Sequence, residues 1–204
     1  MITESVHLEE QTGRPAMTPH ATEPIFRSVH GALKFALNYT HGSLKRSSLA
    51  QMMGDPGGGR GLGGLDGAAQ AGMIRAELGR LAPLRCALLT ARHAAEAEPC
   101  VCRAPCCRGW REKPEWAEAI NYLTEYVLVA GLTGTISHFR LRRSLVCRYF
   151  GGGQTFMSIA SACGVDRDTA SGYNKRIVEN FRSEERKALC EIEGLLKQSG
   201  ILET

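Results

Sequence analysis

Apolar side chains recur at helical spacing along most of this chain, and this repeat constrains the fold more than any other feature. Intervals of three and four residues predict helices over 25–39, 68–79, 84–95 and 116–127, and almost throughout the segment after residue 136. No stretch alternates apolar and polar residues convincingly, as a half-buried strand would, and no internal repeat is present. The sequence therefore predicts an all-α fold.

Two irregular segments divide the predicted helices. Residues 54–67 hold so many glycines that we expect a linker or mobile loop, because each glycine loses much backbone freedom on ordering. A phosphate-binding loop is the other interpretation, but the Gly-Lys-Ser/Thr ending and the preceding strand are missing. The predicted organisation is a flexible tail over 1–24, a helical N-terminal region over 25–98, a cysteine cluster over 99–113 and a helical C-terminal region over 114–204.

Charge and hydropathy exclude several classes of protein. The chain of 204 residues carries a formal charge of +4, which is compatible with a nucleic-acid partner without requiring one. No run of apolar residues is long enough to span a bilayer, so we expect no membrane association. The first ten residues lack the basic start and apolar stretch of a signal peptide, so we expect a cytoplasmic protein of a bacterial host.

Half of the eight cysteines are clustered within eight residues, at Cys100, Cys102, Cys106 and Cys107. Four thiolates around one ion are the usual ligand set of a structural zinc, and nearby proline and glycine residues let the backbone fold around a metal. We expect such a zinc to join the helix before the cluster to the helix after it. The alternative is a redox switch or inert thiols, because Arg103, Arg108 and Arg111 would lower thiol pKa values.

The segment 154–180 has the pattern of a helix-turn-helix. Ala160 is small enough for two helices to cross closely, and Gly164 can adopt the positive φ that the turn needs. Asp166 is expected to cap the second helix by accepting backbone hydrogen bonds. Apolar residues on the facing sides of the two helices would form a small core, at Ile159, Cys163, Val165, Ala170, Tyr173 and Ile177.

The side chains on the outer face of this second helix are of the kinds that contact DNA. Arginine and asparagine pair with base edges in the major groove, and basic residues also contact phosphates. Between Arg140 and Lys187 the chain has ten Lys and Arg against five Asp and Glu. The predicted DNA-binding residues are Arg167, Asp168, Ser171, Asn174, Lys175 and Arg176, together with Arg142 and Arg143 of the preceding helix.

Two family resemblances follow from these residues. The segment 143–193, with Leu145-x-x-x-Tyr149-Phe150, Ile159-Ala160 and Gly164-Val165, resembles the sigma-factor region that reads the promoter −35 element. Most of the chain is loosely similar to the late-gene antitermination (Q-like) proteins of temperate phages, through its cysteine cluster before a helix-turn-helix, and the C-terminal third carries the specific part of this similarity. Segments 28–33, 106–110 and 115–117 carry this resemblance, although the cysteine spacing departs from the family's separated C-x-x-C pairs.

The resemblance implies a protein that binds double-stranded DNA near a late promoter, engages RNA polymerase holoenzyme and reads through terminators. We therefore expect a DNA-binding transcription regulator and not an enzyme, because no cluster of carboxylates or nucleophiles suggests catalysis. Two alternatives remain open. One is an ordinary promoter-bound regulator, and the other is a protein-interaction module with a basic helical face.

Overall fold

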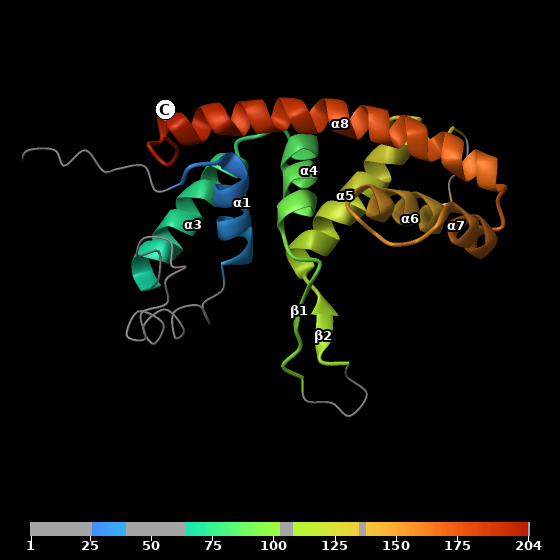
Figure 1. The fold of residues 1–204 in the computed structure, drawn as a ribbon, viewed down its shortest axis with the longest axis horizontal. Helices are drawn as coiled ribbons and strands as arrows, with labels where there is room; N and C mark the ends of the chain where they lie inside the picture. Colours follow the sequence, from blue (N-terminus) through green and yellow to red (C-terminus); the bar gives the residue numbers. More distant parts are fainter. Residues whose placement is uncertain (1–25, 40–63, 103–107, 135–137, 204) are drawn as a thin grey trace, which may run out of the picture.

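One long helix organises the molecule. The computed structural model describes residues 26–39, 64–102, 108–134 and 138–203, and α8 (Arg167–Gln198) extends across the full width of this region. Its 32 residues correspond to a length of about 48 Å. The other helices lie beneath it, with α1 and α3 near its C-terminal end and α6 and α7 near its N-terminal end (Figure 1). The fold is therefore mainly helical, as the apolar spacing predicts.

The N-terminal helices pack under the second half of α8. They are α1 (Val29–Asn38), α3 (Gly64–Leu78) and α4 (Pro83–His93). The chain ends beside its described beginning, because Phe26 pairs with Leu202 in an isolated parallel bridge. Ala188, Ile192 and Leu196 of α8 are fully buried against this part of the core. The start of α3 corrects one expectation, since residues 64–67 of the glycine-rich stretch form its first turn and the rest of that stretch lies outside the described residues.

A short antiparallel hairpin connects α4 to the next helix and projects away from α8 (Figure 1). Its strands are β1 (Ala97–Pro99) and β2 (Trp110–Glu112), in a register that pairs Glu98 with Arg111. The sequence did not predict this element, because three-residue strands are too short to show an alternating pattern. The packing of the helices on either side brings the two strands together.

The remaining helices are α5 (Pro114–Val129), α6 (Phe139–Tyr149) and α7 (Phe156–Cys163). The helix α5 packs against both α4 and α6, and it therefore joins the two ends of the molecule. Phe181 of α8 is fully buried and has aromatic neighbours from α5 and α6. The core is continuous from α1 to α8, so the regions that the sequence separates share one hydrophobic core.

The continuity of α8 differs from the sequence prediction. The predicted helix-turn-helix ends at residue 180, whereas α8 continues to Gln198. The structure has no break there, because neither glycine nor proline occurs between Tyr173 and Glu193 and Phe181 anchors the middle of the helix in the core. Within the described ranges, no helix is long and apolar enough to cross a membrane.

Candidate nucleic-acid interface

The junction between α7 and α8 is a tight turn of three residues. Gly164 has φ +64°, in the left-handed region, and its backbone N–H donates to the carbonyl of Ala160. The Oδ2 atom of Asp166 accepts hydrogen bonds from the backbone N–H groups of Asp168 (2.7 Å) and Thr169 (3.4 Å). The predicted helix cap is therefore present, and it fixes where α8 begins.

The two helices bury the apolar side chains that the sequence assigned to their inner faces. Ile159, Ala170 and Ile177 are almost inaccessible, and Cys163, Val165 and Tyr173 pack partly buried against them. The helix α6 covers this pair and contacts both α7 and α8. The first turns of α8 are thus held on a three-helix unit, with their outer side facing solvent.

Six predicted contact residues lie on these first turns of α8. The exposed ones are Arg167, Asp168, Lys175 and Arg176. Ser171 and Asn174 are half-buried. Among the described residues, no carboxylate forms an ion pair with Arg167, Lys175 or Arg176. The guanidinium of Arg176 lies over the Tyr173 ring, 5.0 Å from its centre. These cations are therefore available to an external anion.

The two predicted contact residues on α6 do not belong to this surface. Arg142 is only 2% exposed, and its Nε donates to the backbone carbonyl of Thr124 on α5 at 3.2 Å. Arg143 binds Glu112 of the hairpin at 2.6 Å and the Asn121 side chain of α5 at 2.6 Å. Because α5 packs along this side of α6, both arginines join helices within the protein. The structure thus places Arg142 inside the protein and not on the exposed face of α8.

Two cysteines of the cluster, Cys100 and Cys102, directly follow strand β1 of the hairpin. The backbone N–H of Cys100 donates to the carbonyl of Gly109 at 2.8 Å, which brings the two ends of the cysteine-bearing segment together. Cys100 is half-buried and Cys102 is exposed, while Cys106 and Cys107 lie outside the described residues. No group of three or more potential metal ligands occurs in the part of the chain that the structure describes. The zinc site therefore stays a prediction.

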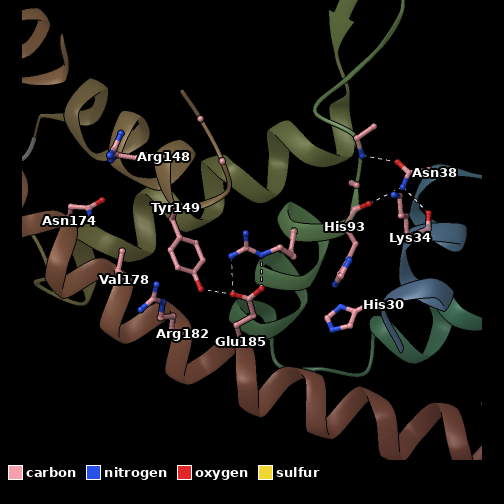
Figure 2. A pocket seen from close by; sticks show the side chains of 15 residues that line it. His30, Lys34, Asn38, His93, Arg148, Tyr149, Asn174, Val178, Arg182 and Glu185 are labelled. Atoms are coloured by element: carbon pink, nitrogen blue, oxygen red, sulfur yellow. Dashed lines mark hydrogen bonds and ion pairs between the residues drawn. The ribbon is translucent and has the colours of Figure 1, made fainter. Parts of the chain in front are cut away.

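A large cleft that the sequence did not reveal lies beside the first half of α8. Its volume is about 1090 Å³, and it is bordered by α1, α4, α8 and the loop after α6. Figure 2 shows Asn174, Val178, Arg182 and Glu185 of α8 along one side, with His30 and Lys34 of α1 across from them. Side chains from four separate elements meet here only after folding. No local sequence pattern could have indicated the cleft.

Arg92, Glu185 and Tyr149 form a hydrogen-bonded network inside the cleft, and Figure 2 labels Glu185 and Tyr149. Arg92 binds both carboxylate oxygens of Glu185, at 2.7 and 3.1 Å, and the Tyr149 hydroxyl donates to the same carboxylate. Burial alone would raise the pKa of Glu185, but these hydrogen bonds outweigh it and lower that pKa. Burial and then the neighbouring Glu185 raise the pKa of Tyr149 to about 12. The network therefore keeps Glu185 ionised and paired.

Two histidines face each other on the α1–α4 side of the cleft. The rings of His30 and His93 have their centres 5.1 Å apart. Burial, followed by the charge of His30, lowers the pKa of His93 to about 4. The Nε2 atom of His93 is buried and has no hydrogen-bond partner among the described residues. His93 is thus a neutral imidazole near pH 7.

The described surface thus offers two features that suit an anionic partner, the exposed start of α8 and the adjoining cleft. In comparisons with known proteins, no family model, curated protein or solved structure matches this chain.

Proposed function

We propose that this protein is a DNA-binding transcription regulator of the phage type, in which α7 and the start of α8 form a helix-turn-helix and the first turns of α8 enter the major groove. One observation carries the proposal. A three-helix unit holds Arg167, Lys175 and Arg176 exposed at the start of α8, and none of them is paired with a described carboxylate. Recognition helices contact base edges through residues in their N-terminal turns, and these three residues lie in the first turns of α8.

The short turn and the cap support the same proposal. Gly164 and Asp166 fix where α8 begins and how it leaves α7, so the side chains of its first turns have defined positions. Defined positions are what base recognition needs, because a hydrogen bond to a base edge tolerates little displacement. Asp168 on the same turns is an acceptor and would suit the amino group of cytosine.

The narrower proposal is a late-gene antiterminator that acts on RNA polymerase holoenzyme. It rests on the family resemblance, namely a cysteine cluster placed before a helix-turn-helix in a helical chain of this size. The hairpin is the part of the molecule that projects away from α8 (Figure 1). Because DNA would lie at the start of α8, the hairpin would remain accessible to a second macromolecule.

A binding experiment tests the proposed DNA-binding face. Sites are selected from a pool of random duplexes with the wild-type protein, and affinities are then measured for Arg167→Ala and for the control Lys197→Ala. Loss of a base contact should weaken specific binding by about 1–3 kcal/mol. Lys197, near the far end of α8, forms its own ion pair with Glu193, so its replacement should leave affinity unchanged. Equal affinity of wild type and Arg167→Ala for the selected sites would reject the assignment.

A genome-wide crosslinking map tests the narrower proposal. An antiterminator that loads at a late promoter and travels with polymerase should give a peak there with signal trailing into the downstream genes. A sharp peak without a trail would indicate an ordinary promoter-bound regulator. If the protein crosslinks to no DNA but still crosslinks to polymerase or another protein, the result would favour a protein-interaction module.

A further inference from the structure

The cleft beside α8 carries more positive than negative charge. Its borders hold four cationic side chains, Lys34, Arg92, Arg148 and Arg182, and one carboxylate, Glu185. Arg92 is matched by Glu185 at 2.7 Å. Within the described residues, Lys34, Arg148 and Arg182 have no carboxylate partner. The cleft therefore has an excess of positive charge that nothing in the described chain neutralises.

Each of these three cations reaches the cleft from a different element. Lys34 lies on α1, Arg148 at the end of α6 and Arg182 on α8 (Figure 2). The guanidinium of Arg148 stacks on Phe156, 4.2 Å from the ring centre, and also donates to the backbone carbonyl of Gln154. Its orientation is thus fixed by neutral partners, and its charge remains available. Such a convergence suits an extended anion better than a single small one.

Buried polar atoms at the cleft also lack partners. The Oδ1 atom of Asn174 and the Nε2 atom of His93 are buried and make no hydrogen bond within the described chain. Because the two ends of an asparagine amide are nearly equivalent in shape, a half-turn of the Asn174 side chain would present its NH₂ group at the same place. A buried polar atom without a partner is costly, so a ligand that supplies one gains affinity.

The cleft continues the face of α8 that carries the proposed DNA contacts. Asn174, Val178, Arg182 and Glu185 follow one another at intervals of three and four residues and line the cleft. The same interval extended toward the N-terminus reaches Ser171 and Arg167. From Arg167 to Arg182 the helix advances about 22 Å, more than the roughly 12 Å width of the major groove. A helix whose first turn lies in the groove would thus carry Arg182 past its edge, where the phosphates are.

The lining does not suit a small organic ligand. Such pockets are mostly apolar with a few polar groups, whereas more than half of the residues that line this cleft have a charged, imidazole or amide side chain. From the unmatched charge, the unpartnered atoms and the shared helix face, we propose that the cleft binds the phosphodiester backbone of duplex DNA next to the segment contacted by the start of α8. This inference rests on the proposed function, and it adds Lys34, Arg148 and Arg182 to the interface.

The salt dependence of DNA binding tests the cleft. The probe is a fluorescently labelled 30-base-pair duplex of random sequence, titrated over a range of KCl concentrations. The double variant Lys34→Gln with Arg182→Gln removes two unpaired charges. Because each lost phosphate contact lowers the slope of log affinity against log salt by about 0.9, the slope should fall by nearly two. Affinity for random and selected duplexes should fall by the same factor, since backbone contacts are independent of sequence.

A matched control removes the same charge elsewhere. Arg80→Gln with Lys197→Gln also changes the net charge by two, but both residues lie toward the far end of α8 and are paired with Glu77 and Glu193. This control should keep the wild-type slope. Thermal unfolding checks that both double variants remain folded. We expect this because Lys34 and Arg182 have no ion-pair partner within the described residues, and Arg80 and Lys197 each pair only with a residue three or four positions away.

The other outcomes separate failure of this inference from failure of the proposed function. If the cleft variant keeps the wild-type slope while Arg167→Ala loses affinity for selected sites, DNA binding stands and the cleft assignment is overturned. If the wild type binds neither random nor selected duplexes, both are overturned. If poly-glutamate binds as tightly as the duplex and the cleft variant abolishes this, the cleft belongs to an acidic protein segment and the inference is also overturned.

Discussion

Arg92 on α4 binds the carboxylate of Glu185 on α8 through two hydrogen bonds, although 93 residues separate them in the chain. The guanidinium of Arg92 also lies over the rings of Tyr149 and Phe150, 4.8 and 4.9 Å from their centres. This single side chain therefore connects the N-terminal helices, the end of α6 and the middle of α8. The Arg92 side chain therefore helps to hold α8 in position relative to the other borders of the cleft.

Replacement of Arg92 by alanine should lower the free energy of unfolding by about 2 kcal/mol. This value lies between that of an exposed ion pair and that of a fully buried one, and Glu185 would be left largely buried without its partner. Chemical denaturation measures the change. Arg80→Ala, which breaks an exposed pair with Glu77, should cost less than about 0.5 kcal/mol. Equal losses in the two variants would show that the Arg92 network does not hold the helices together.

Replacement by alanine should change stability in opposite directions at two glycines, one in the turn before α8 and one within α8. Gly164→Ala forces a side chain into a left-handed conformation and should cost about 1 kcal/mol. Gly194 lies inside α8, and an added Cβ would meet nothing within 4 Å. Gly194→Ala should therefore stabilise the protein by about 0.5–1 kcal/mol through better helix propensity. Thermal unfolding distinguishes the two, and stabilisation by Gly164→Ala would contradict the turn geometry.

The half-buried side chain of His93 predicts how the stability of the protein depends on pH. His93 has an ordinary pKa of 6.5 in the unfolded chain and about 4 in the folded one. As pH falls below 6.5 the unfolded state takes up a proton that the folded state refuses, so stability is complete above pH 6.5 and is lost toward pH 4. Because His93 is only half-buried, solvent screening reduces the loss, and we expect about 1–2 kcal/mol in full. Denaturation at pH 7 and pH 5 measures the larger part of this loss before Glu185, whose pKa is lowered, becomes protonated.

A variant assigns this pH dependence to one residue. His93→Gln removes the titrating group, and the difference in stability between pH 7 and pH 5 should shrink accordingly. His138→Gln is the comparison variant, because His138 is exposed at the start of α6. Its Nδ1 atom accepts a hydrogen bond from the backbone N–H of Leu141, so only the difference between pH 7 and pH 5, and not the absolute stability, is compared. If the stability of both variants depends on pH as strongly as that of the wild type, the imidazole of His93 is not the source of the pH dependence.

Local features of the fold were predictable from the sequence, and those that arise from contacts between distant segments were not. Helical spacing located α1, α4, α5 and α6, and the Asp166 cap and the Gly164 turn follow from the preferences of single residues. The continuation of α8 through residue 181 depends on Phe181 fitting among aromatic residues of α5 and α6, which no local pattern reveals. The hairpin likewise depends on the packing of α4 against α5.

The same division holds for the candidate site. The exposed cations of α8 could be found because helical spacing places them opposite its buried residues. The burial of Arg142 could not be predicted, because it depends on α5 lying beside α6. Lys34 and Arg182 reach the cleft from elements distant in the sequence, and neither stands in a motif.

The cysteine cluster gives the last prediction. The hydrogen bond between Cys100 and Gly109 and the ion pair of Glu98 with Arg111, at 2.6 Å, close the base of the segment that carries all four thiols. Closure of so short a segment limits how far its cysteines can separate, which favours their joint binding of one zinc ion. Cys102→Ser and Cys106→Ser should each lower both the zinc content and the temperature of unfolding, because metal binding contributes directly to folding.

Metal analysis of freshly purified protein and unfolding with and without a chelator measure both effects. Cys190→Ser is the matched control, since Cys190 is exposed on α8, far along the chain from the hairpin. Its replacement should change neither the zinc content nor the response to the chelator. A wild-type protein that contains no zinc, and whose unfolding temperature the chelator does not change, would reject the metal and favour a redox role for the thiols. In that case Arg108, which is exposed beside the cluster, would act by lowering thiol pKa values.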